Sequence, residues 1–251
     1  MMATQVGVTL DMMEMHCRAV VRGRKRAMIV CDLPFGTYEW SDEVAVRSSI
    51  KLLREGGADA VKLEGGSPRR IHAVRAITDA GIAVLGHVGL TPQQISVLGG
   101  FRPQGRSAES AMAIIREAKA LEAAGAVALV VECVPSVLGA AVTAAVKIPT
   151  IGIGAGPYTS GQVLVYHDVL GLISHPHHEA ATPKFCKKYA NVGDEIVHAL
   201  RTYVHDVQQE KYPTHEYSPY VLPAHETVQF VQSLEDEGLH ECADAARNAG
   251  L

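Results

Sequence analysis

The sequence lacks any segment that could cross a membrane, because no apolar run approaches the roughly 20 residues that a spanning helix needs. It also lacks an excess of positive charge, with 23 Lys and Arg against 27 Asp and Glu. The formal charge of -4 provides no basic field that would attract nucleic acid or an anionic membrane surface. These absences exclude neither a binding protein nor an enzyme, but they make small molecules the expected partners.

Disulfide, zinc and nucleotide signatures are missing as well. The five cysteines are odd in number, far apart and include no CxxC pair, which argues against a disulfide framework or a zinc site and fits a reducing compartment. The chain has no dinucleotide fingerprint, no P-loop, and neither a GxSxG nor an HExxH motif. An NAD-dependent enzyme is therefore the weakest alternative, and common hydrolases are disfavoured. The N-terminal residues have neither a signal-type apolar core nor a transit-peptide composition.

What the sequence does contain is a repeated alternation of short apolar runs and amphipathic stretches. Each apolar run ends near glycine, proline or a helix-capping residue, which predicts a strand followed by a helix. A first helix is expected over Leu10–Val21. The six expected strands lie at 27–32, 60–63, 82–86, 127–132, 150–153 and 161–166, the last of which also reads as the start of a helix. Later helices are expected near 108–124, 136–146, 192–209 and 228–246.

Continuously apolar strands that alternate with helices indicate a parallel sheet covered on both faces, either a (β/α) barrel or a doubly wound sheet. Polar residues stand at or just past the ends of four predicted strands, where barrels of this type place their chemistry. We therefore expect an α/β fold of the (β/α)8 TIM-barrel type, although six strands fall short of eight. Residues 1–213 are expected to form this incomplete barrel, and residues 214–251 a C-terminal extension.

A charged pair follows the second predicted strand. Lys62 and Glu64 are two residues apart, so their side chains point to the same face, where charges must be paired or serve a site. Asp32 directly follows the first apolar strand, although a lone carboxylate in such a position is as often a cap as a ligand. A functional role is thus favoured for the pair and left open for Asp32.

Two further polar residues end later strands. His87 ends the third strand, and an isolated histidine is more often structural than catalytic. Glu132 ends a five-residue apolar run, where an ionised carboxylate is expensive to bury without a partner or a task. A general acid or base role is accordingly predicted for Glu132.

Two motifs receive less weight. The run Ile151–Gly156 (IGIGAG) is interpreted as a glycine-lined rim that lets a ligand or a neighbouring backbone come close. His175, His177 and His178 have spacing suggestive of metal binding, but they stand in a polar, proline-containing loop and are interpreted as solvated.

Nine motifs follow one another along most of Thr9–Pro213: DLPFGTY, VKLEGG, GHVGLTPQ, GGFRPQGR, LEAAGA, VVECVP, IPTIGIGAG, GQVLVYHD and TPKFCKKY. In sequence and in order they resemble the motifs of the ketopantoate hydroxymethyltransferase family. Details such as GGFRPQGR are similar to its plant-type members.

This resemblance implies a barrel enzyme that transfers the methylene carbon of 5,10-methylenetetrahydrofolate to 3-methyl-2-oxobutanoate, giving 2-dehydropantoate on the way to pantothenate. It implies Mg2+ as the cofactor, with Asp32 binding metal and substrate and Glu64 in the metal shell. Lys62 is implied to contact the substrate and Glu132 to accept the proton. His87 could hydrogen-bond the acid. A homo-oligomer is also implied, and a mitochondrial location as in the plant-type members.

The departure from the family lies before Asp32, where members have about two further βα units, one ending in a GDS-type motif with a metal-binding aspartate. Two alternatives follow. The chain could be a catalytically silent truncated isoform within the family's oligomer, which magnesium affinity would distinguish. It could also be a related metal-dependent oxo-acid lyase or mutase, which would not release tetrahydrofolate.

Overall fold

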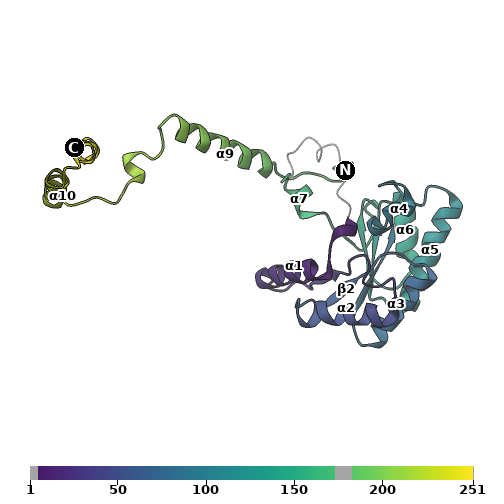
Figure 1. The fold of residues 1–251 in the computed structure, drawn as a ribbon. Helices are drawn as coiled ribbons and strands as arrows, with labels where there is room; N and C mark the ends of the chain where they lie inside the picture. Colours follow the sequence, from purple (N-terminus) through teal and green to yellow (C-terminus); the bar gives the residue numbers. More distant parts are fainter. Residues whose placement is uncertain (1–4, 173–182, 251) are drawn as a thin grey trace. The chain divides into compact units, whose positions relative to one another are not determined.

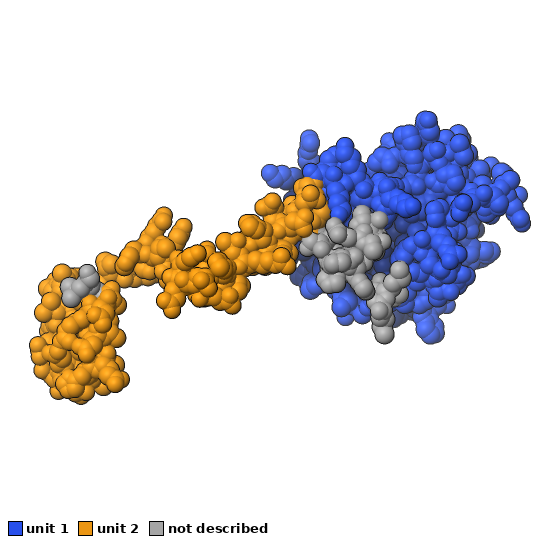
Figure 2. Space-filling model, turned by 90° about the horizontal axis from the view of Figure 1, so that it is seen from above, with its two compact units in different colours: residues 1–169, 175–189 blue, residues 170–174, 190–251 orange. Residues whose placement is uncertain are grey.

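The computed structural model describes residues 5–172 and 183–250. The described chain divides into two compact units, coloured separately in Figure 2. Unit 1 contains described residues 5–169 and 183–189, and unit 2 contains 170–172 and 190–250. No helix of the described part is long and apolar enough to cross a membrane.

Unit 1 is built on one six-stranded sheet (Figure 1). All five strand pairs are parallel, and the spatial order is the chain order, from β1 to β6. The strands are β1 (Val30–Asp32), β2 (Ala60–Lys62), β3 (Val84–Gly89), β4 (Ala128–Glu132), β5 (Thr150–Ile153) and β6 (Gly161–Gln162).

This strand order decides between the two folds that the sequence left open. A doubly wound sheet reverses its strand order at a switch point, whereas the described strands follow one another without reversal. The six strands therefore form a curled half-barrel rather than a doubly wound sheet, and the predicted α/β class with a parallel sheet is confirmed.

Helices connect the strands, and several of them begin at a capping side chain. Thr9, Ser41 and Ser107 each accept a backbone N–H of the first turn, which satisfies one of the helix's free donors. A proline at the first helical position opens the helix after β2. The helices of unit 1 are α1 (Leu10–Gly23), α2 (Asp42–Arg54), α3 (Pro68–Asp79), α4 (Ile95–Leu98), α5 (Ala108–Ala123), α6 (Ser136–Ala145) and α7 (Tyr166–Val169), with 3-10 turns at Gln5–Gly7 (η1) and Pro92–Gln94 (η2).

The core of unit 1 lies between the strands and the helices that follow them. Val61, Leu129 and Val84 on neighbouring strands are fully buried, and so are Leu52 on α2 and Leu121 on α5. Burying apolar side chains stabilises the fold by roughly 25 cal/mol for each Å2 of apolar area that is removed from water. This packing fixes the strand ends that carry the polar residues.

The last predicted strand is shorter than expected. β6 pairs with β5 only at Gly161 and Gln162, and the Val163 amide adds one further bond to Gly152. The Val165 carbonyl then accepts the amides of residues 168 and 169. The chain thus turns into α7, which is the helical alternative that the sequence had left open.

Unit 2 contains α9 (Val192–Gln208), η3 (His215–Tyr217), α10 (Ala224–Asp236) and α11 (His240–Gly250). The prediction of α9 is confirmed, and the Leu170 and Gly171 carbonyls accept its first two amides. The prediction of a single helix over 228–246 is wrong. Gly238, with φ of +76°, ends α10, a conformation that glycine adopts without steric cost.

Candidate active site

The predicted site residues come together at the carboxyl ends of four neighbouring strands. Asp32 ends β1 and Lys62 ends β2, and the two are register partners. His87 lies within β3, and Glu132 ends β4, opposite Gly89. Because all of these strands are parallel, their polar ends meet at the same edge of the sheet.

Lys62 contacts the first and third strands at this edge. Its Nζ lies 3.1 Å from Asp32 Oδ2 and 3.3 Å from His87 Nδ1. Burial by itself would lower the pKa of Lys62, but the carboxylates of Asp32 and Glu64 outweigh it and raise that pKa above its ordinary value. Lys62 is therefore a charged ammonium paired with Asp32.

His87 is buried and electrically neutral. Burial, followed by the Lys62 charge, holds the pKa of His87 well below its usual range. A neutral ring whose Nδ1 accepts a hydrogen bond from the Lys62 ammonium carries its own proton on Nε2. Nε2 lies 3.1 Å from Glu132 Oε2, but without hydrogen-bond alignment, so Nε2 has no hydrogen-bond partner in the described structure.

Glu132 has the properties of a general base. Its side chain is 17% exposed, and burial raises its pKa to about 7, with Lys62 lowering and Asp32 raising that value. A base with a pKa near the operating pH combines a substantial ionised fraction with a useful affinity for a proton. The acid–base role of Glu132 stays a prediction, with which its burial and raised pKa are compatible.

Glu64 lies deeper, with 2% of its surface exposed. Burial raises its pKa to about 7, against the lowering effects of Lys62 and of a hydrogen bond from the Gln93 backbone. That amide donates to Glu64 Oε2 at 2.8 Å. Glu64 is therefore a carboxylate held in place by the loop that follows β3.

The residues that support Glu64 carry no signal at the predicted strand ends. Tyr38 and Gln93 are buried, and the Tyr38 hydroxyl donates to Gln93 Oε1 at 2.6 Å. Arg70 is also buried and lies over the Tyr38 ring. Tyr38 and Gln93 stand in DLPFGTY and GLTPQ, next to the residues that were chosen, but neither stands at a predicted strand end.

The balance of charges at this edge suits a hard divalent cation. Asp32, Glu64 and Glu132 are three carboxylates, and Lys62 is the cation whose charge acts on two of them most strongly. Oxygen ligands of this kind suit Mg2+, which commonly takes one or two carboxylates and completes its shell with water and substrate. The described residues contain no group of three or more His, Cys, Asp or Glu that could by itself hold a metal ion.

The glycine-rich run Ile151–Gly156 is approached closely by protein atoms. A Cβ on Gly154 would lie 2.5 Å from the Phe185 ring, and one on Gly156 would lie 2.4 Å from the Ser136 Cβ. The glycines therefore admit neighbouring parts of the same chain, one of the two alternatives predicted for this rim. His175, His177 and His178 lie outside the described residues.

The residue after Glu132 has an unusual backbone conformation. Cys133 has φ of +50°, in the left-handed region that non-glycine residues seldom occupy. Its amide donates to the Ile153 carbonyl, and its carbonyl accepts from the Gln104 amide, both at 2.9 Å. This turn fixes the direction in which the chain leaves the end of β4.

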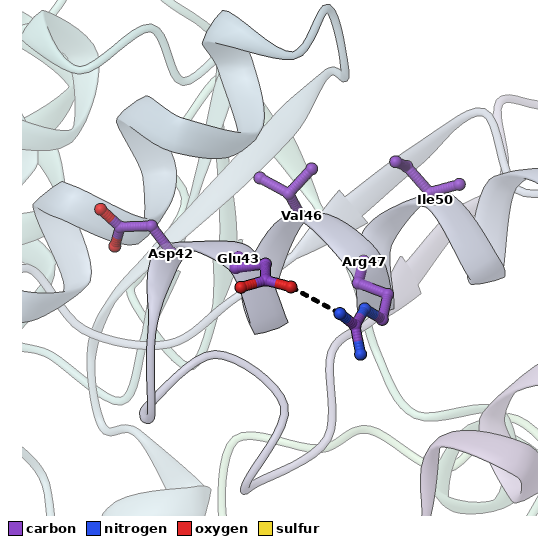
Figure 3. Close-up of a pocket in the computed structure, with 5 residues that line it drawn as sticks. All are labelled: Asp42, Glu43, Val46, Arg47 and Ile50. Atoms are coloured by element: carbon purple, nitrogen blue, oxygen red, sulfur yellow. Dashed lines mark hydrogen bonds and ion pairs between the residues drawn. The ribbon is translucent and has the colours of Figure 1, made fainter.

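A shallow depression elsewhere on unit 1 is unrelated to these residues (Figure 3). All of its lining residues belong to α2, with Val46 and Ile50 providing apolar surface and Arg47 paired with Glu43. Both members of that ion pair are strongly exposed, and such pairs contribute little to stability. The depression contains no strand-end residue.

The sequence is similar to one family of known proteins over most of its length. The model of the ketopantoate hydroxymethyltransferase family matches residues 2–215. The "3-methyl-2-oxobutanoate hydroxymethyltransferase 1, mitochondrial" of Arabidopsis thaliana is 56% identical over 243 residues, which cover 97% of this chain and 70% of that protein. The rice (Oryza sativa subsp. japonica) protein of the same name is 54% identical, over 98% of this chain and 68% of its own length.

Among solved structures, a 2,3-dimethylmalate lyase, a member of the PEP mutase/isocitrate lyase superfamily, aligns with a TM-score of 0.47 at 15% identity. The alignment covers 99% of this chain and 81% of that one.

Proposed function

The chain belongs to the ketopantoate hydroxymethyltransferase family, and from this membership we propose that it is a 3-methyl-2-oxobutanoate hydroxymethyltransferase acting in pantothenate biosynthesis. In this reaction the C3 carbon of the oxo acid bonds to the methylene carbon of 5,10-methylenetetrahydrofolate. Water supplies the hydroxyl group, and tetrahydrofolate leaves. The observation that supports the proposal best is the contact chain from Asp32 through Lys62 and His87 to Glu132, with links of 3.1 to 3.3 Å.

Glu132 is the group proposed to remove the C3 proton. Its raised pKa suits that role, and its carboxylate lies beside a neutral imidazole whose Nε2–H lacks an aligned acceptor. The His87 N–H could then donate to the carboxylate or to the oxo acid during the transfer. Lys62 is proposed to contact the substrate, where its positive charge would stabilise the enolate that forms when the proton leaves.

Mg2+ is the proposed cofactor, with Asp32 as a ligand that also contacts the substrate and Glu64 in the surrounding shell. When bound, the ion would polarise the carbonyl next to C3 and so make the C3 proton more acidic. Asp32 is suited to direct contact because its side chain is 44% exposed. Glu64 is suited to orienting the shell because it is buried and held by the Gln93 amide.

We also propose that the half-barrel is a section of a (β/α)8 barrel. β1 and β6 are the two open edges of the described sheet, so two further βα units would close it. Residues 1–213 are proposed as the incomplete catalytic domain and residues 214–251 as an extension. The names of the plant relatives support a mitochondrial location, and a homo-oligomer remains a proposal carried by the family resemblance.

The experiment that tests the function compares this chain with a version carrying the N-terminal units of the Arabidopsis relative. Conversion of 3-methyl-2-oxobutanoate and methylenetetrahydrofolate is measured with and without Mg2+, together with release of tetrahydrofolate. Turnover by both proteins would support the proposal in full. Turnover by the extended protein alone would identify this chain as a silent form, and turnover of the oxo acid without folate would indicate a lyase or mutase.

A further inference from the structure

We infer that Gln93 is a positioning residue that sets the placement of the Glu64 carboxylate relative to the end of β1, with Tyr38 fixing Gln93 in turn. This inference rests on the proposed metal site for its functional consequence. Gln93 belongs to the 3-10 turn Pro92–Gln94 after β3, and 6% of its surface is exposed. It bears no charge and does not stand at a strand end.

Gln93 makes hydrogen bonds to three different parts of the site. Its backbone N–H donates to Glu64 Oε2 at 2.8 Å. Its side-chain Nε2 donates to the carbonyl of Leu33, the residue directly after Asp32, at 2.9 Å. Its Oε1 accepts from the Tyr38 hydroxyl at 2.6 Å. One residue of the loop after β3 therefore links the ends of β1 and β2.

Tyr38 supports both Gln93 and Glu64 through its hydroxyl group. It is fully buried, and its hydroxyl oxygen also accepts the Glu64 backbone N–H at 3.4 Å. The Arg70 guanidinium lies 4.7 Å from the centre of the Tyr38 ring and donates through Nε to the Glu64 carbonyl at 3.2 Å. Arg70 is itself paired with Glu39 at 3.1 Å. Glu64 is thus fixed at its amide, its carbonyl and its carboxylate.

A network of this kind does more than fill the core. A buried polar group costs free energy unless it is hydrogen-bonded, so Gln93 strongly favours the arrangement in which its donors and acceptor are all satisfied. The bonds converge on the carboxylate and the strand end proposed to hold the cation. Groups that orient carboxylates beside a metal commonly change its affinity by about tenfold or more when they are removed.

The test measures Mn2+ binding, a probe for the Mg2+ site, by the electron paramagnetic resonance of free Mn2+ in the full chain. Tyr38→Phe breaks the bond to Gln93 Oε1 and the bond from the Glu64 N–H. Gln93→Leu breaks both side-chain bonds of Gln93 while keeping its backbone N–H. Each variant should bind Mn2+ about tenfold more weakly. Because both variants remove the same Tyr38–Gln93 bond, the loss of affinity in the double variant should be smaller than the product of the two single effects.

Thr78→Val is the matched control. It removes a hydrogen bond of 2.9 Å to the Ala124 carbonyl, at the end of α3 and away from the strand ends. Variants that lose similar thermal stability but differ in Mn2+ affinity, with the control unchanged, would support positioning. Equal affinity in all of them would overturn the inference.

A second measurement separates this inference from the proposed metal site. Amide hydrogen exchange at Gln93 and Glu64 reports the network directly, and needs neither metal nor turnover. In Tyr38→Phe the Glu64 amide loses its acceptor directly, so the informative amide is that of Gln93. Exchange at the Gln93 amide should accelerate, while amides of α5 stay unchanged. If the parent chain binds no Mn2+ but Gln93 amide exchange accelerates in Tyr38→Phe, the metal proposal fails and the positioning role stands. Unchanged exchange in Tyr38→Phe rejects the positioning role.

Discussion

Lys62 and Asp32 are register partners at the ends of two parallel strands, and their side chains meet with Nζ 3.1 Å from Oδ2. The same ammonium lies 3.3 Å from His87 Nδ1 and lowers the pKa of both Glu64 and Glu132. One cation therefore acts on acidic groups from three strands. Its removal should change the titration of groups that it does not touch.

Lys62→Met should raise the pKa of Glu132 above its value of about 7 in the parent chain, because the variant removes the positive charge that favours the ionised carboxylate. Titration of the Glu132 side-chain carboxyl by 13C NMR measures this directly, without turnover. Lys62→Arg keeps the charge and is the matched control. A Glu132 pKa that stays the same in Lys62→Met would contradict the electrostatic account.

Glu132→Gln should abolish most proton transfer while leaving the fold intact. The amide cannot accept the C3 proton, and loss of a general base commonly lowers a rate by about 10^2 to 10^4. The measurement is solvent deuterium exchange at C3 of 3-methyl-2-oxobutanoate, followed by 1H NMR with Mg2+ present. Glu109→Gln, an exposed carboxylate in the first turn of α5, is the control. Exchange that persists in Glu132→Gln would remove Glu132 from the base role.

The exchange rate should also depend on pH through the same carboxyl. With a folded pKa of about 7, the ionised fraction of Glu132 falls about tenfold per pH unit well below 7 and levels off above it. Lys62 stays protonated over this range because its pKa is raised. The rate should therefore rise to a plateau as pH increases. A rate that is already flat between pH 5 and 7 would mean that a different group controls the transfer.

The free energy of unfolding should decrease as pH rises, whereas the exchange rate should increase. The folded pKa of Glu132 is raised from 4.5 to about 7, so between these values the folded chain holds a proton that the unfolded chain has lost. Stability from this group is complete below pH 4.5 and is lost as pH rises through 7. The size of the effect is on the order of 3 kcal/mol. Urea unfolding at pH 5 and pH 8 should show a smaller difference in Glu132→Gln, which has no such carboxyl, than in the parent chain.

Much of the fold could be predicted because its signals are local. Ser41 and Ser107 begin helices through contacts within one turn, and glycines such as Gly125, with φ of +97°, end them. The predicted strand at 150–153 is confirmed at both ends. The end of β6 and the break between α10 and α11 were harder to place. They depend on which carbonyl each amide reaches, and an apolar run does not specify that.

The site was predictable to the extent that each residue stands at a strand end. Parallel pairing then brings Asp32, Lys62 and Glu132 to one edge of the sheet, and the structure places them there. Gln93 could not be found in this way. Its amide meets Glu64 across 29 positions of sequence and its side chain meets Leu33 across 60. Such contacts depend on how the loops fold back over the sheet, so they cannot be predicted from the spacing of residues in the sequence.

The left-handed turn at Cys133 gives a prediction that joins backbone strain to the base. An L-residue with φ of +50° carries a steric cost of roughly 1 to 2 kcal/mol, and a β-branched side chain tolerates this region least. Cys133→Val should therefore destabilise the chain by about 1 to 2 kcal/mol relative to Cys133→Ser, which keeps the size of the side chain. Cys133→Gly should fold well, since relief of strain offsets the added freedom of the unfolded chain.

Because this turn directly follows Glu132, the same series should affect the chemistry. Cys133→Gly and Cys133→Ser should retain C3 exchange, since both preserve the turn that aims the carboxylate at the His87 side of the site. Cys133→Val should lose exchange at temperatures where it is still folded, as checked by circular dichroism. Equal exchange in the Val and Ser variants would mean that the direction of the Glu132 side chain does not depend on this turn.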